Sequence, residues 1–242
     1  MHKDRLFTSG SISEDFTFND RVAEVFDDML NRSVPCYSVV IDGIAGLLEH
    51  KNLHGRTIYD LGCSTGTTLL ELARRLPELD CRFVGIDNAP AMINKARQKA
   101  EMFSKSSVIR FIEDDIATAG LDEAGVILCN YTLQFIRPMT RLQFVRRLYE
   151  KLPPGGMCIV SEKIISHDKI LNREFIARHH HFKRRQGYSE LEIAAKREAL
   201  ENILVPFSIE ENIDLLRQAG FQSVETFFQW FNFASFVALK QP

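Results

Sequence analysis

The sequence of 242 residues lacks long apolar runs, paired cysteines and a strong excess of one charge. Its formal net charge is -2, and 45% of its residues are hydrophobic against 26% charged, as in an ordinary folded protein. No apolar run approaches the roughly 20 residues of a membrane span, and residues 1–10 lack the apolar core of a signal peptide. We therefore expect a cytoplasmic protein without a membrane segment.

The five cysteines stand singly, without a C-x-x-C pair, and this pattern favours reduced thiols over a disulfide framework or a zinc site. A net charge close to zero gives no overall attraction to nucleic acid, so direct nucleic-acid binding is not expected. Neither a repeat nor a low-complexity linker divides the chain. We expect one domain, residues 1–242.

Short apolar strands alternate with helical segments through the middle of the sequence. Five strands are predicted, at residues 57–61, 82–87, 108–112, 125–130 and 157–161. This alternation predicts an α/β fold with a doubly wound, mostly parallel sheet at residues 56–165. Around it we expect N-terminal helices at 18–50, a helical cap at 166–204, and a closing helix and strands at 205–242, with an antiparallel last strand.

Polar residues follow four successive strands, at the sheet edge where open parallel sheets bind ligands. Gly62 and Gly66 bracket a tight turn, but their spacing is not the G-x-G-x-x-G of dinucleotide folds. Asp87 ends the second strand, where a carboxylate can accept hydrogen bonds from both ribose hydroxyls. Asp115 and the Ile116 backbone are placed for adenine. Each could be a simple strand-end cap, but together they indicate an adenosylmethionine site.

Asn130 completes the series, because it ends the fourth strand beneath the expected reacting group. The segments Tyr59–Gly66 (YDLGCSTG), Gly85–Met92 (GIDNAPAM) and Leu152–Gly156 (LPPGG) resemble motifs of class I S-adenosylmethionine-dependent methyltransferases. The expected fold is therefore of this Rossmann-like type.

Further segments resemble the carboxy-S-adenosyl-L-methionine synthase family (CmoA family) over nearly the whole chain. They are Arg32–Tyr37 (RSVPCY), Asn130–Phe135 (NYTLQF), Ser161–Lys163 (SEK), His180–Arg184 (HHFKR), Gly187–Ile193 (GYSELEI) and Phe231–Phe233 (FNF). The resemblance implies an enzyme that converts S-adenosyl-L-methionine and prephenate to carboxy-S-adenosyl-L-methionine and phenylpyruvate. It also implies that a separate tRNA carboxymethyltransferase uses the product to modify wobble uridine.

The resemblance places the family's ligand contacts on ten residues of this sequence: Tyr37, Gly62, Cys63, Ser64, Asp87, Asn88, Asp115, Ile116, Asn130 and Arg197. Cys36 departs from the family pattern, in which glycine is expected beside the first contact. No metal is implied, and a homodimer is expected from the resemblance and from the apolar faces of the N-terminal helices and the cap.

Arg197 is also a candidate without the resemblance. Ser189 and Glu192 form a capping box, and the helix that follows carries an apolar stripe at Ile193, Leu200 and Leu204. Arg197 is expected on this inward stripe, where its guanidinium would pair with a carboxylate. A snorkelling side chain or an internal ion pair are the alternatives. We assign Arg197 as the catalytic candidate.

Two basic clusters could suggest a metal site and a phosphate site, and we reject both interpretations. His179, His180 and His181 are consecutive on a predicted helix, so their side chains point about 100° apart and cannot converge on one metal ion. The segment Lys183–Arg185 is interpreted as a solvated charged turn rather than a phosphate site.

The alternative functions are a conventional methyltransferase of a small acid or RNA, and a non-catalytic adenosylmethionine sensor.

Overall fold

The computed structural model describes residues 4–6, 17–201 and 203–241. Most of the segment 1–10, on which the signal-peptide expectation rests, lies outside these residues. No helix within the described part of the chain combines the length and apolar character that a bilayer span needs.

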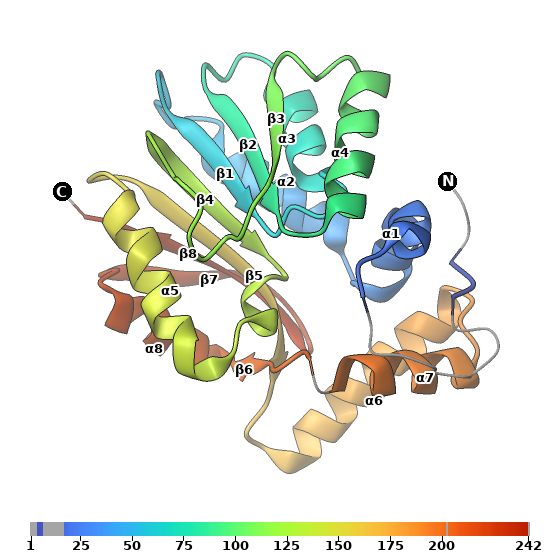
Figure 1. Cartoon of the computed structure of the whole chain (residues 1–242). Helices are drawn as coiled ribbons and strands as arrows, with labels where there is room; N and C mark the ends of the chain where they lie inside the picture. Colours follow the sequence, from blue (N-terminus) through green and yellow to red (C-terminus); the bar gives the residue numbers. More distant parts are fainter. Residues whose placement is uncertain (1–3, 7–16, 202, 242) are drawn as a thin grey trace.

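One central sheet organises the protein (Figure 1). Its strands are β1 (Thr57–Leu61), β2 (Arg82–Asp87), β3 (Ile109–Glu113), β4 (Ala124–Asn130), β5 (Met157–Ile165), β6 (Phe207–Ser208), β7 (Ser223–Trp230) and β8 (Phe233–Leu239). The order is β3-β2-β1-β4-β5-β8-β7, and β6 pairs with β5. Strands β1 to β5 are parallel, whereas β8 runs antiparallel to β5 and β7. The predicted α/β sheet with an antiparallel closing strand is confirmed.

Helices cover both faces of the sheet. One apolar core lies between the sheet and α2 (Tyr37–Leu48), α3 (Thr67–Arg75) and α4 (Pro90–Met102). A second core lies between the other face and α5 (Pro138–Lys151) and α8 (Ile209–Ala219). Because β4 is apolar along nearly its whole length, it suits this doubly covered centre, and Val126, Ile127 and Leu128 are fully buried.

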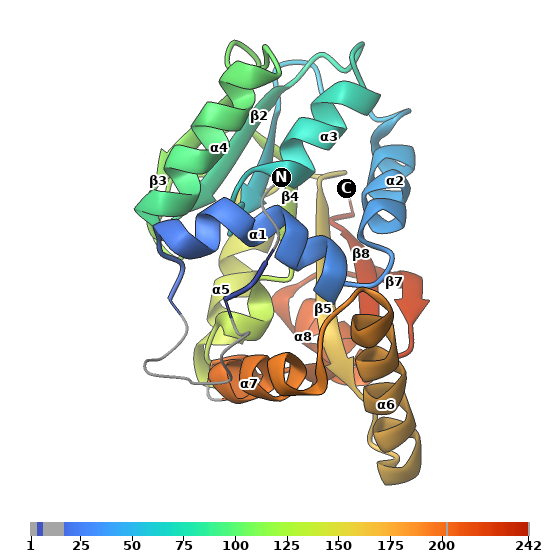
Figure 2. The same ribbon diagram turned by 90° about the vertical axis from the view of Figure 1, so that its right-hand side faces the viewer.

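Three further helices lie beyond the carboxyl ends of the parallel strands: α1 (Asp20–Ser33), α6 (Lys169–Arg185) and α7 (Glu190–Glu201) (Figure 2). Helices α6 and α7 form the predicted cap, and Gly187, with φ of 86°, lies in the turn between them. The predicted capping box is confirmed, since Ser189 N–H donates to Glu192 Oε2 at 2.8 Å and Glu192 N–H donates to Ser189 Oγ at 3.2 Å.

A partly buried polar cluster fixes α1 over the first strand-helix turn. Lys99 Nζ of α4 donates to Asp27 Oδ2 of α1 at 2.7 Å, and the hydroxyls of Thr65 and Thr67 donate to Asp27 Oδ1. The Lys99 ammonium and these hydroxyls lower the pKa of Asp27 against the opposing effect of burial. The carboxylate therefore stays charged, and α1 is held close to the ends of β1 and β2.

Candidate adenosylmethionine site

A cavity of about 1050 Å³ opens at the carboxyl ends of the parallel strands, between the sheet, α1 and the cap. Nine of the ten predicted ligand residues line it: Tyr37, Gly62, Cys63, Ser64, Asp87, Asn88, Asp115, Ile116 and Asn130. They come from four strand ends and one helix. Their contacts with a ligand stay a prediction, but the structure brings them around one space.

The Gly62–Gly66 turn needs glycine at both ends. Gly62 and Gly66 each have φ of 74°, in the left-handed region that other residues rarely adopt. A Cβ atom on Gly62 would lie 2.7 Å from Thr132 Oγ1, and one on Gly66 would overlap the Phe111 ring. Main chain therefore lines this part of the cavity, and the N–H groups of Gly62 and Cys63 hold it in place by donating to the Ile86 carbonyl at 2.8 and 3.1 Å.

Asp87, predicted to bind a ribose, also holds the glycine turn in place. Its two carboxylate oxygens accept hydrogen bonds from the N–H groups of Ser64 and Ala89, both at 2.9 Å. Burial raises the pKa of Asp87, and these N–H donors oppose the rise. Each oxygen keeps a lone pair for a further donor, so the carboxylate can bind the two hydroxyls of a ribose.

Asp60 is a residue of the cavity that sequence reasoning did not select. It is the penultimate residue of β1, is 2% exposed, and lines the same space. Burial, followed by the charge of Asp87, raises the pKa of Asp60 to about 7. No hydrogen bond to its carboxyl group is found within the described residues. The signal that could have identified it was a carboxylate within an otherwise apolar strand, two residues before Gly62.

The part of the cavity near Asp115 is more open. The Asp115 carboxylate accepts a hydrogen bond from the Ala117 N–H at 2.8 Å, and its side chain lies at the exposed rim. The Ile116 carbonyl is held by the Arg147 guanidinium at 3.0 Å. At the inner end, Asn130 Nδ2 donates weakly to Thr68 Oγ1 at 3.4 Å, while its Oδ1 is buried without a partner among the described residues.

Aromatic side chains enclose the inner end of the cavity. Tyr37, Tyr131 and Phe233 follow one another with ring centroids 6.1 and 6.2 Å apart. Burial raises the pKa of Tyr37, whose hydroxyl contacts Thr68 Oγ1 at 3.0 Å. Cys36, the departure from the family pattern, has φ of 58° directly before α2. A left-handed conformation explains why glycine is expected there.

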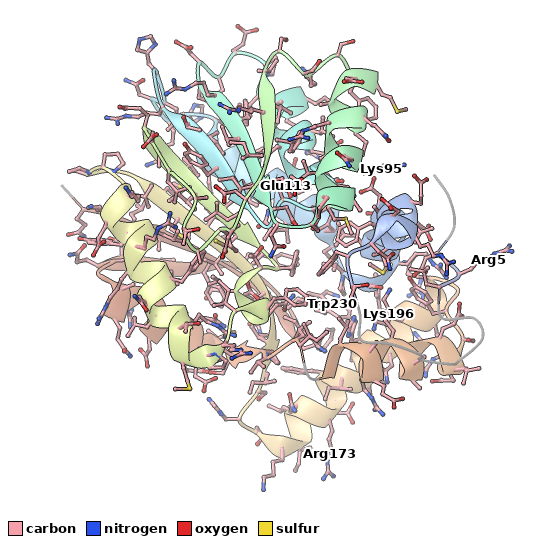
Figure 3. The ribbon with its side chains drawn as sticks, in the orientation of Figure 1. Arg5, Lys95, Glu113, Arg173, Lys196 and Trp230 are labelled. Carbon is pink, nitrogen blue, oxygen red and sulfur yellow. The ribbon has the colours of Figure 1, made fainter. Side chains whose placement is uncertain are left out.

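The cap corrects the expectation for Arg197. Arg197 is exposed and does not line the cavity, whereas its neighbour Lys196 is 4% exposed and does. Figure 3 shows Lys196 directed from α7 toward α1, while Arg173 of α6 points outward. The inward position assigned to Arg197 is wrong by one residue. The expected contact of Arg197 with a ligand carboxylate stays a prediction. The cavity lining gives it no support, because Arg197 is not part of it.

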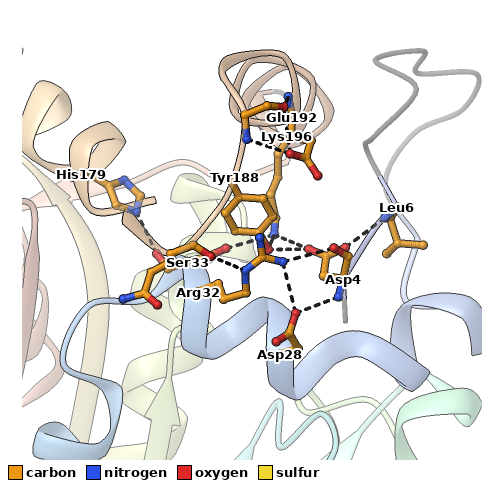
Figure 4. A network of polar contacts seen from close by, with 11 residues as sticks. Asp4, Leu6, Asp28, Arg32, Ser33, His179, Tyr188, Glu192 and Lys196 are labelled. Carbon is orange, nitrogen blue, oxygen red and sulfur yellow. Dashed lines mark hydrogen bonds and ion pairs between the residues drawn. The ribbon is translucent and has the colours of Figure 1, made fainter. Parts of the chain in front are cut away.

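Lys196 belongs to a network that joins the N-terminal segment, α1 and the cap (Figure 4). Its Nζ lies 3.0 Å from Ser33 Oγ and 3.4 Å from Asp4 Oδ2. Arg32 donates to the Asp4 carbonyl at 3.2 Å, and its guanidinium carbon lies 3.8 Å from the centroid of the Tyr188 ring. Since Asp4 is 1% exposed, this network closes one side of the cavity with buried charge.

The basic clusters of α6 also differ from expectation. Lys183 is 9% exposed and lines the cavity, so the interpretation of Lys183–Arg185 as a solvated turn is wrong for this residue and right for Arg184 and Arg185, which are exposed. His179 is buried with Nε2 2.8 Å from the Ser33 carbonyl, and burial lowers its pKa to about 2.

The neighbouring His180 is half-buried and His181 is exposed, so the three imidazoles lie in different environments. Among residues 4–6, 17–201 and 203–241, no group of three or more His, Cys, Asp or Glu side chains is arranged to hold a metal ion.

Comparison with known proteins agrees with the fold. The family model "Methyltransferase domain" matches residues 58–156. Human N-acetylserotonin methyltransferase, solved in complex with SAM, superimposes with a TM-score of 0.63 at 17% identity, over 99% of this chain and 63% of that longer chain. An O-methyltransferase family 2 protein from Planctomyces limnophilus gives 0.64 at 16% identity, over 97% and 65%. These structures establish the methyltransferase fold alone.

Sequence relatives define the family. Carboxy-S-adenosyl-L-methionine synthase of Desulfotalea psychrophila is 56% identical over 241 residues, which cover 99% of this chain and 98% of the relative. The synthase of Wolinella succinogenes is 48% identical over 239 residues and 98% of each chain. This chain therefore belongs to the carboxy-S-adenosyl-L-methionine synthase family, transferases with the fold of class I S-adenosylmethionine-dependent methyltransferases.

Proposed function

We propose that this protein converts S-adenosyl-L-methionine and prephenate to carboxy-S-adenosyl-L-methionine and phenylpyruvate. The observation that carries the proposal is the single cavity that collects nine of the ten expected ligand residues in a chain 56% identical to a synthase of this name. Its volume of about 1050 Å³ is large enough for a nucleoside and a second small acid together.

The strand ends supply a complementary set of groups for S-adenosyl-L-methionine. Asp87 binds the ribose hydroxyls, and Asp115 with the Ile116 N–H binds adenine. The main chain of the glycine turn lies against the thioether side. The Asp60 carboxylate faces the same space and complements the positive charges of the sulfonium and the α-ammonium group. A bound cation next to Asp60 favours its charged form.

The two substrates supply all the atoms and electrons that the proposed reaction needs. Prephenate loses its ring carboxyl group as carbon dioxide and its ring hydroxyl group as hydroxide, driven by aromatisation to phenylpyruvate. The sulfonium methyl gives up one proton, which combines with the hydroxide to form water. The carbon of the resulting ylide then forms a bond to carbon dioxide. The net products are carboxy-S-adenosyl-L-methionine, phenylpyruvate and water, and no oxidant or reductant is required.

The protein's part in this reaction is to position the substrates and exclude water. Carbon dioxide must meet the ylide before it escapes, so the two substrates must be held close together in a closed pocket. The Tyr37, Tyr131 and Phe233 rings provide an apolar wall at the inner end of the cavity. The Asp4 and Lys196 network ties the cap to α1 over the opposite side.

We further propose a cytoplasmic homodimer that does not bind nucleic acid directly and passes its product to a separate tRNA carboxymethyltransferase for wobble uridine modification. Support for the dimer comes from exposed apolar side chains on the outer part of α6, where Ile170 is 74% exposed and Leu171 is 51% exposed. Sedimentation at micromolar concentration tests this assembly, and a monomer alone would contradict it.

The function is tested by incubation of the protein with S-adenosyl-L-methionine and prephenate, followed by mass spectrometry of the nucleoside. We expect a nucleoside heavier by one carbon dioxide, together with phenylpyruvate. Formation of S-adenosylhomocysteine and a methylated acceptor would instead identify a conventional methyltransferase. Unchanged ligand at every prephenate concentration would identify a sensor.

A further inference from the structure

Three lysines from three different elements line the cavity, close enough for the charges of two of them to act on the third. Lys163 comes from β5, Lys183 from α6 and Lys196 from α7, and all three line the cavity. Lys183 and Lys196 are 9% and 4% exposed. Buried ammonium groups are rare unless they are paired, because desolvation of a charge is costly. The position of each lysine therefore needs an explanation.

Only one of the three is explained by the fold. Lys196 is held by Asp4, Ser33 and Tyr188, as described above. For the amino groups of Lys163 and Lys183, no hydrogen bond or ion pair to another described residue is found. These two amino groups thus have no hydrogen-bond acceptor among the described residues. Each can donate to a ligand in the cavity.

Electrostatics support the same conclusion. Burial, followed by the charges of Lys196 and Lys163, lowers the pKa of Lys183 to about 7. Burial also lowers the pKa of Lys163. No acidic group contributes to the shift of either lysine. The charges of Lys163 and Lys183 are therefore not offset by a described carboxylate, whereas Asp60 and Asp87 supply carboxylates elsewhere in the cavity lining.

We propose that Lys163 and Lys183 form the binding subsite for a dianionic, dicarboxylate co-substrate, each amino group binding one carboxylate. The inference rests on the proposed function, and it assigns the binding residues that neither the sequence motifs nor the resemblance supplied. A dicarboxylate satisfies both lysines, whereas a monocarboxylate leaves one buried ammonium unpaired. Lys196, already paired with Asp4, adds positive potential behind them.

The experiment measures binding without turnover. Protein saturated with S-adenosylhomocysteine, which has no methyl group to carboxylate, is titrated with prephenate by calorimetry. Lys163→Met and Lys183→Met should each weaken prephenate binding on the order of tenfold to a hundredfold, because each removes a charge-assisted hydrogen bond. Affinity for S-adenosylhomocysteine should change less than about twofold, and this also shows that the variants are folded.

Two further variants sharpen the result. Lys169→Met is the matched control, since Lys169 is exposed at the start of the same helix as Lys183, and it should bind prephenate as the unaltered protein does. Lys183→Arg keeps the charge and should restore part of the affinity lost in Lys183→Met. Phenylpyruvate, a monocarboxylate, should bind more weakly than prephenate and lose less of its affinity in the methionine variants.

Proton uptake provides an independent readout. The groups that face Lys183 are Lys163 on β5, Lys196 on α7 and His179 on its own helix, and His179 is neutral above about pH 2. A carboxylate bound to Lys183 raises its pKa. At pH 8, binding of prephenate should therefore take up protons. The binding heat measured by calorimetry should then depend on the ionisation enthalpy of the buffer. Lys183→Met should reduce this uptake.

The outcomes separate the two proposals. If the unaltered protein forms carboxy-S-adenosyl-L-methionine from prephenate but both methionine variants bind prephenate normally, the lysine subsite is refuted and the proposed function stands. If the unaltered protein neither binds prephenate nor converts it, the proposed function fails and the subsite fails with it.

Discussion

Substitution of Asp60 by asparagine tests the electrostatics of the cavity floor. Asp60 is 2% exposed and has no hydrogen-bond partner for its carboxyl group among the described residues. Burial and the nearby Asp87 raise its pKa from the ordinary value of 3.8 to about 7. Asparagine has nearly the same shape and carries no charge at any pH. The variant therefore removes the titration while it leaves the volume of the side chain in place.

The sign of the effect follows from proton linkage. Between pH 4 and pH 7, native Asp60 holds its proton while the unfolded chain releases it. The unfolded state then binds fewer protons, so this residue's contribution to stability is present at low pH and is lost as the pH rises toward 7. A tenfold change in proton affinity corresponds to about 1.4 kcal/mol. From pH 5 to pH 8, Asp60→Asn should therefore gain about 3 kcal/mol in unfolding free energy relative to the unaltered protein.

Urea denaturation of both proteins at pH 5, 6, 7 and 8 measures this difference. Because the two proteins are compared across pH, any pH-independent effect of the amide on packing cancels from the difference in unfolding free energy. A difference that grows with pH and levels off above about pH 7 supports the account. Parallel stability curves would refute a buried, uncompensated carboxyl group at this position. In the same series, affinity for S-adenosyl-L-methionine should weaken below about pH 7 in the unaltered protein, as Asp60 takes up its proton.

Three other substitutions have defined outcomes. Asp87→Ala should weaken S-adenosyl-L-methionine and its carboxylated form alike, by about a hundredfold, because a ribose contact does not sense the group on sulfur; calorimetry that shows a selective loss would contradict the ribose assignment. Lys196→Met should lower the unfolding free energy by about 3 kcal/mol, because the buried Asp4 carboxylate loses its cation. The control Arg197→Met should stay within about 0.5 kcal/mol, and equal losses would refute the inward position of Lys196. Gly62→Ala should lower the melting temperature, since φ of 74° and the close Thr132 hydroxyl disfavour a Cβ atom; an unchanged melting temperature would show that the turn is not strained.

The sheet was predictable because its strands are short apolar runs bounded by strong turn signals. The predicted strands at 57–61 and 82–87 match β1 and β2 residue for residue. The series of polar strand ends then followed from topology, since parallel strands present their carboxyl ends at one edge. The strand expected to end at Ser161 continues to Ile165, because pairing with β8 extends through Lys163. Such tertiary pairing leaves no signal in local composition.

The cap was harder to predict than the sheet. On a helix that carries Ile193 and Leu200, positions 196 and 197 lie on neighbouring parts of the same face, so the helical period alone does not decide between Lys196 and Arg197. Buried partners from distant segments decide it, since Asp4 and Ser33 receive the Lys196 ammonium. Lys183 was missed for the same reason, because only the folded chain shows that this basic segment has one side against a cavity.

The most direct test of the account is the mass of the nucleoside formed by the purified protein from S-adenosyl-L-methionine and prephenate. The proposed function predicts a product heavier than the substrate by one carbon dioxide, formed in equal amount with phenylpyruvate and dependent on both substrates. S-adenosylhomocysteine as the product, or S-adenosyl-L-methionine recovered unchanged while prephenate persists, would contradict it.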